Sequence, residues 1–96
     1  MNGEIQLQFL AIAIFYLRED RRREKHLLAG YESVTPLPLF EPQELELLIA
    51  NRNLVLLNYL FETTNADEIA LVPGYLDKTQ RRLKHFFETG EFALLQ

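Results

Sequence analysis

Residues 65–92, NADEIALVPGYLDKTQRRLKHFFETGEF, decide the fold that the sequence predicts. The stretch opens with Asn65 and Glu68, which have the spacing of a capping box. In that motif the first side chain accepts from backbone N–H groups of the first helical turn, and the glutamate reaches back. We therefore expect a short helix over 66–72.

A turn and a longer helix are predicted to follow. Pro73 and Gly74 indicate the turn, because proline lacks a backbone donor and glycine permits positive φ. Asp77 is a suitable N-cap for a last helix over 78–89, and Gly90 is expected to end it. Beyond the glycine, three apolar residues alternate with smaller or polar ones as in a short strand: Phe92, Leu94 and Leu95.

This order of elements resembles the winged helix-turn-helix regulators, over residues 56–92 only. It looks most like their metalloregulator and multidrug-regulator branches. The matching positions are the Glu68-Ile69-Ala70 element, the turn residue Gly74, the buried recognition-helix residues Leu83 and Phe86, and the pre-wing Gly90. Pro73 departs from the pattern, since the family usually has an apolar helical residue there. The chain also leaves room for one wing strand rather than two, and no Cys or His cluster matches a metal-sensing site.

The resemblance implies that the last helix enters the major groove of DNA. Helical periodicity places Thr79, Leu83 and Phe86 on one buried stripe. The opposite side holds Asp77, Lys78, Arg81, Lys84, His85 and Glu88. The predicted DNA-contacting residues are Lys78, Gln80, Arg81 and Lys84. Lys78 and Arg81 would reach base edges, with the other two beside them. A solvated helix face with no binding role predicts the same pattern of charge.

The N-terminal part, residues 1–29, is predicted to be one long helix over 3–28, although 4–9 also alternate as a strand would. From Phe9 to Leu17 the sequence is apolar on every side, and a helix of that kind must be buried all round. Because so small a domain can cover only one side, we expect a homodimer. The predicted interface residues are Phe9, Leu10, Ile12, Ile14, Phe15 and Leu17.

The middle of the chain is predicted to be a proline-containing connector, residues 30–42, leading into a helix-turn-helix-like core, residues 43–96. A helix should begin near Glu41 or Pro42, and residues 51–53, Asn-Arg-Asn, are a candidate break within it. Its apolar residues are Leu45, Leu48, Ile49, Leu56, Leu57, Leu60 and Phe61.

Length and composition predict a single, mainly α-helical cytoplasmic domain. The chain has 96 residues, no cysteine, and a net charge of -4. No apolar run is long enough to span a bilayer. No motif for a nucleophile, phosphate loop or metal is present, and His26 and His85 lack partners at ligand spacing, so we expect neither enzyme activity nor a cofactor.

Two functions remain open from the sequence. One is a small transcriptional regulator that binds double-stranded DNA as a homodimer and acts by occupying an operator. The other is a non-enzymatic protein-interaction module, such as an inhibitor or assembly factor of a phage or mobile element, built on a winged-helix-like core. The acidic net charge favours the second, because nucleic-acid binders are usually basic.

Overall fold

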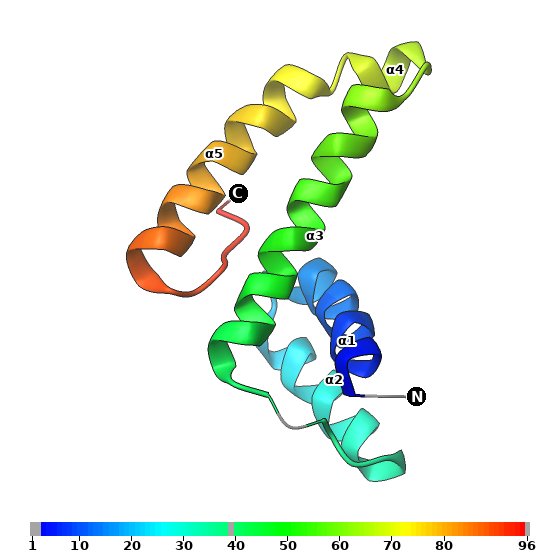
Figure 1. Ribbon diagram of the computed structural model, residues 1–96, viewed down its shortest axis with the longest axis vertical. Coiled ribbons are helices and arrows are strands. Elements are labelled where there is room, and N and C mark those ends of the chain that lie inside the picture. Colours follow the sequence, from blue (N-terminus) through cyan, green and yellow to red (C-terminus); the bar gives the residue numbers. More distant parts are fainter. Residues whose placement is uncertain (1–2, 39, 96) are drawn as a thin grey trace.

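The computed structural model describes residues 3–38 and 40–95, and this part of the chain is helical without strands (Figure 1). The helices are α1 (Gly3–Leu17), α2 (Arg21–Val34), α3 (Pro42–Glu62), α4 (Ala66–Ile69) and α5 (Val72–Thr89). The prediction of a mainly α-helical domain is confirmed. The predicted wing is not found in the described residues, since a wing needs strands.

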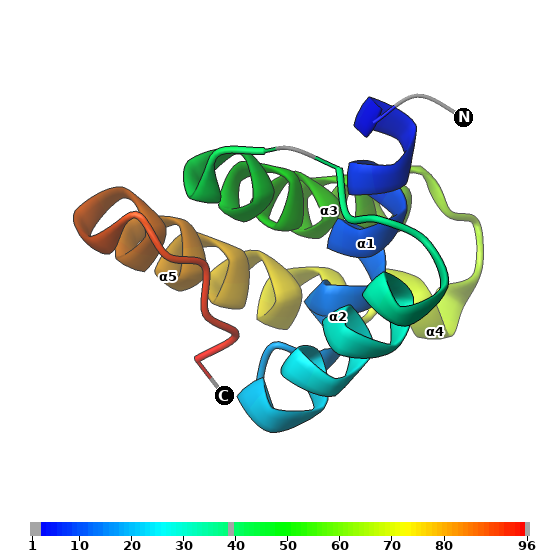
Figure 2. The ribbon, with the colours of Figure 1, turned by 90° about the horizontal axis from the view of Figure 1, so that it is seen from below.

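Helix α3 is the centre of the structure. It packs against α1 and against α5, while α2 contacts α1 and α4 contacts α3 (Figures 1 and 2). The buried core comes from α1, from α3 and from the segment after α5. Its members are Leu7, Leu10, Ala11, Ile14, Phe15, Leu45, Ile49, Ala50, Phe92 and Leu94.

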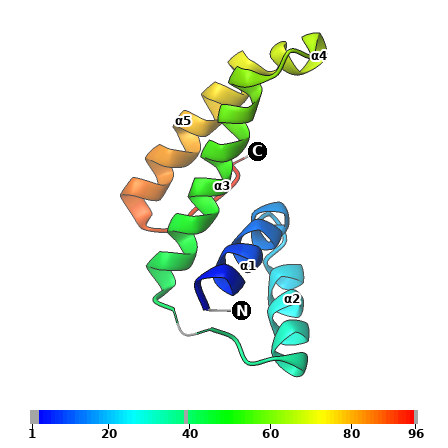
Figure 3. The ribbon, with the colours of Figure 1, turned by 45° about the vertical axis from the view of Figure 1, so that its right-hand side comes forward.

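The prediction of one long N-terminal helix is wrong. The chain leaves α1 at Leu17 and turns back, so that α2 lies beside α1 (Figure 3). Asp20 explains the break, because its carboxylate accepts hydrogen bonds from the backbone N–H groups of Arg22 and Arg23, each at 3.2 Å. This is an N-cap, which fixes a helix start at this point of the sequence.

The connector is also shorter than predicted. Gly30 does not end a helix: it lies inside α2, which continues to Val34. The next helix begins at Pro42 as expected, with the proline in its first turn, where no backbone donor is needed.

A buried arginine joins the N-terminal helices to the rest of the chain. Arg18 is only 4% exposed, and its Nε donates to Glu24 Oε1 at 2.8 Å. Its Nη1 donates to the carboxylate of Glu46 and, at 3.0 Å, to the carbonyl oxygen of Phe92. The pKa of Arg18 lies above its ordinary value: burial alone would lower it, and the hydrogen bonds and negative charges of Glu46 and Glu24 more than offset that effect.

A second buried polar cluster joins α3 to α5. Asn53 is fully buried, and its Nδ2 donates to Thr79 Oγ1 at 2.7 Å. Arg82 Nη1 donates to Asn53 Oδ1 at 2.6 Å, and its Nε donates to the carbonyl oxygen of Leu94 at 2.8 Å. These contacts explain why α3 continues through residues 51–53, where the sequence suggested a break: the buried asparagine is satisfied by α5 rather than by a turn.

The predicted turn at Gly74 is wrong. Helix α4 ends at Ile69, and α5 already begins at Val72, so Pro73 lies in its first turn and Gly74 inside it. Proline is tolerated there because the first N–H groups of a helix have no helical partner. Asp77 is consequently a residue within α5, not its N-cap.

The start of α4 agrees with half of the predicted capping box. Asn65 Oδ1 accepts from the backbone N–H groups of Asp67 at 2.9 Å and Glu68 at 3.2 Å. The Glu68 carboxylate does not complete the box. It accepts instead from the hydroxyl groups of Tyr59 at 3.0 Å and Thr63 at 2.7 Å.

The end of α5 is at Gly90, as predicted, and this glycine is left-handed with φ of 77°. The segment that follows is not a strand. Its backbone oxygens at Phe92 and Leu94 accept from Arg18 and Arg82, so side chains take the place of a strand partner.

We expect Arg18→Ala to lower the free energy of unfolding by about 3–5 kcal/mol, because it leaves the half-buried Glu46 without a cation and the buried Glu24 with only Arg21, 3.8 Å away. The control is Arg23→Ala, which removes an exposed contact to Asp20 and should cost less than about 1 kcal/mol. Urea unfolding followed by circular dichroism measures both. Equal losses in the two variants would contradict the structural role of Arg18.

Candidate functional site

The side of α3 turned away from the core carries a row of exposed apolar side chains. Leu47, Leu54 and Phe61 are 60%, 43% and 58% exposed. Residues seven apart lie almost in line along a helix, so the three form one row. Asn51 and Asn58 are exposed between them, and we call these five residues the α3 stripe.

A groove lies on each side of the first half of this stripe, along residues 47–55 of α3. The groove toward α5 has a volume of about 340 Å³, and its lining residues are Leu47, Leu48, Ala50, Asn51, Leu54, Leu83, Phe86 and Phe87. Phe87 is 78% exposed, the largest exposure of an aromatic side chain among the described residues. An aromatic ring in that position is an anchor available to a binding partner.

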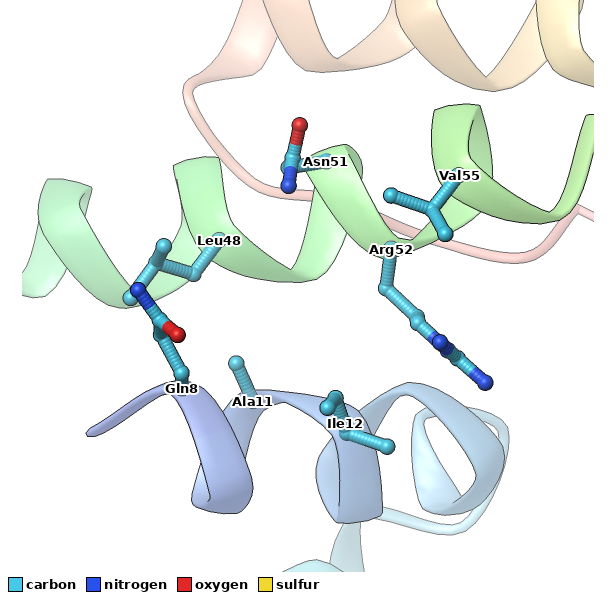
Figure 4. Close-up of a pocket in the computed structure, with 7 residues that line it drawn as sticks. All are labelled: Gln8, Ala11, Ile12, Leu48, Asn51, Arg52 and Val55. Atoms are coloured by element: carbon cyan, nitrogen blue, oxygen red, sulfur yellow. The ribbon is translucent and has the colours of Figure 1, made fainter. Parts of the chain in front are cut away.

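The groove toward α1 has a volume of about 240 Å³ (Figure 4). Its lining residues are Gln8, Ala11 and Ile12 from α1, and Leu48, Asn51, Arg52 and Val55 from α3. Arg52 also donates through Nη2 to the hydroxyl group of Tyr16 at 3.2 Å. Among the described residues that line the two grooves, Arg52 alone is charged. The stripe and its grooves thus form a largely uncharged surface, which we call the α3 face.

The four predicted DNA-contacting residues, Lys78, Gln80, Arg81 and Lys84, are all exposed on α5. Arg81 Nε lies 3.1 Å from Asp77 Oδ2, so part of its charge is compensated within the helix. Lys78 lines a hollow together with Glu19 of the α1–α2 connection. Helical spacing places Gln80 nearly opposite Lys78, so these two do not share one surface.

The predicted buried stripe of α5 is largely as expected. Thr79 is buried, while Leu83 and Phe86 are half-buried and pack against the core. Sequence reasoning missed Arg82, which is buried beside them. Helical spacing could have found it, because Arg82 is three residues after Thr79 and four before Phe86, whereas Arg81 lies on the opposite side of the helix.

The predicted dimer interface is wrong for three of its six residues. Leu10, Ile14 and Phe15 are buried in the core of the chain itself, where α3 and Phe92 cover them. They are not available to a second copy. Ile12 and Leu17 are half-buried, and Phe9 is exposed.

Across residues 3–38 and 40–95, no group of three or more His, Cys, Asp or Glu side chains is placed to hold a metal ion. In the same residues, no helix is long and apolar enough to cross a membrane.

Comparisons with known proteins returned no match to a family model, a curated protein or a solved structure. The α3 face was also missed by sequence reasoning, which listed Phe61 with the other apolar residues of this helix and did not separate buried from exposed positions. The signal that could have found it is the seven-residue spacing of Leu47, Leu54 and Phe61, because the buried residues of α3 lie on other positions of the helix.

We expect Phe87→Ala and Phe92→Ala to change the free energy of unfolding by very different amounts, although the substitution is the same. Phe92 is fully buried, so its truncation should lower the free energy of unfolding by about 3–5 kcal/mol. Truncation of the exposed Phe87 should change it by less than about 0.5 kcal/mol. Denaturant midpoints of the two variants measure the difference. A large loss of unfolding free energy in Phe87→Ala would mean that this ring is part of the core and not of a binding surface.

Proposed function

We propose that this protein acts without catalysing a reaction, as a protein-interaction module that binds its partner through the α3 face. The observation that carries the proposal is the exposed apolar row Leu47, Leu54 and Phe61, flanked by two grooves and by Phe87. Contiguous apolar surface of this kind, rimmed by polar residues, is typical of interaction sites on soluble proteins.

The composition of the α3 face indicates what kind of partner fits it. The groove toward α5 is lined by apolar residues apart from Asn51, and the groove toward α1 is mixed and holds the one charged residue, Arg52, whereas the chain as a whole carries a net charge of -4. Binding would therefore draw on burial of apolar area rather than on charge attraction. An amphipathic helix can fill such a groove with apolar residues at positions i, i+3 or i+4, and i+7.

The framework behind the α3 face supports the same function. On its inner side α3 is joined to α5 through Asn53 and Arg82, and to Arg18 through Glu46. A surface held on a helix with fixed neighbours loses little conformational freedom when a partner binds, which lowers the cost of association.

The test is affinity capture with the intact chain, in the presence of nuclease and high salt. We expect Leu54→Glu to abolish capture of a specific protein, because it places a charge in the centre of an apolar seam. The matched control is Val34→Glu, which introduces the same charge at an exposed apolar residue at the end of α2. Capture that is unaffected by Leu54→Glu, or lost equally in both variants, would contradict the proposal.

A second candidate function is DNA binding through α5, as a homodimeric regulator that occupies an operator. One observation favours it: Lys78, Gln80, Arg81 and Lys84 are all exposed on one helix. Arg81 could make two hydrogen bonds to a guanine, a contact that discriminates among bases. The acidic net charge of the chain weighs against it.

For this candidate we expect a labelled random-sequence duplex to bind at about 50 mM salt and to weaken by orders of magnitude at about 200 mM, because released counterions drive phosphate binding. The double variant Arg81→Glu/Lys84→Glu should not bind. Fluorescence anisotropy measures both. Absence of binding by the wild-type protein at the lower salt concentration would eliminate the DNA candidate.

A further inference from the structure

We propose that the partner of the α3 face is a second copy of this chain, packed α3 against α3 about a two-fold axis. This inference rests on the proposed function, because it names the occupant of the same surface. Its support comes from the spacing of the α3 stripe, from the chemistry of its two asparagines, and from its area.

The spacing of the stripe is that of a helix that packs along its length against another helix. Leu47, Asn51, Leu54, Asn58 and Phe61 follow one another at intervals of four, three, four and three residues, which is the seam of a heptad repeat. All five residues are exposed in the chain by itself. The other helices of the chain therefore leave this seam open.

The two asparagines of the seam indicate what kind of helix covers the seam. Within residues 3–38 and 40–95, neither Asn51 nor Asn58 makes a side-chain hydrogen bond. A partner that covers the seam must supply polar groups at these two points, since a buried amide without a partner is costly. An asparagine amide carries both donors and an acceptor, so it is complementary to another asparagine.

A two-fold axis brings the asparagines together. Asn51 and Asn58 are equally far along the sequence from the midpoint between Leu54 and Val55. If α3 of one copy lies antiparallel to α3 of the other about that midpoint, Asn51 of each chain lies opposite Asn58 of its partner. The contact is then made twice, as a two-fold interface requires.

The apolar area of the α3 face is what such a dimer needs. The exposed parts of Leu47, Leu54, Val55, Phe61 and Phe87 amount to about 500 Å² in each chain, from their exposed fractions and ordinary side-chain areas. Two copies would bury about 1,000 Å² of apolar surface, the apolar share of a standard interface of about 1,600 Å². Glu44 continues the seam one turn before Leu47, and Glu62 follows its last residue, so each end of the contact is acidic while its centre at Leu54 carries no charge.

Two double variants of the full chain test the proposal: Asn51→Lys/Asn58→Lys and Asn51→Glu/Asn58→Glu. Sedimentation equilibrium should show a wild-type dimer, whereas each variant alone should dissociate with a Kd at least about 100-fold weaker, because like charges meet in the seam. An equimolar mixture of the two variants should restore the dimer. Far-UV circular dichroism confirms that these exposed substitutions leave the helices intact.

The matched control is Arg22→Glu, which changes the net charge by as much as the double glutamate variant but lies on α2, where Arg22 is exposed. It should remain dimeric. A wild-type protein that is monomeric at about 100 µM would overturn the second-copy proposal. So would dimers that persist in both double variants. Leu54-dependent capture of a different protein by a monomeric wild type would overturn this proposal alone and leave the protein-binding function standing.

Discussion

The structure depends on the burial of one guanidinium group. Arg18 contacts the carboxylates of Glu24 in α2 and Glu46 in α3 and the backbone oxygen of Phe92, so three segments distant in sequence meet at one side chain. Glu46 also accepts from the backbone N–H of Phe92 at 2.8 Å, which closes the arrangement. A buried cation is retained only where its charge and donors are satisfied, and these contacts satisfy them.

Arg82 repeats the arrangement from the other side of the C-terminal segment. Arg82 donates hydrogen bonds to the backbone oxygen of Leu94 and to the side-chain oxygen of Asn53 in α3. With both arginines in place, Phe92 and Leu94 fill the core without any strand pairing. The inner side of α3 thus packs against other parts of the chain. Its outer side stays exposed and is the surface available for binding.

Features that depend on neighbouring residues could be predicted from the sequence. Pro42 begins α3, Asn65 caps α4 and Gly90 ends α5, because each acts on backbone groups within one helical turn. The turn expected at Gly74 failed for a related reason. Pro73 and Gly74 are compatible with the first turn of a helix as well as with a loop, and the contacts of Thr79 and Arg82 with α3 favour the helix.

The helical class, the starts of α3 and α4 and the end of α5 followed from the sequence alone, since they depend on propensity and on capping within one helical turn. The sequence also contained the α3 stripe, in the seven-residue spacing of Leu47, Leu54 and Phe61. Which apolar residues are buried and which are exposed depends on tertiary contacts. Leu10, Ile14 and Phe15 turned inward and Leu47 and Leu54 outward because α3 is covered on one side only, and the side it turns to the core is set by contacts between residues far apart in the chain.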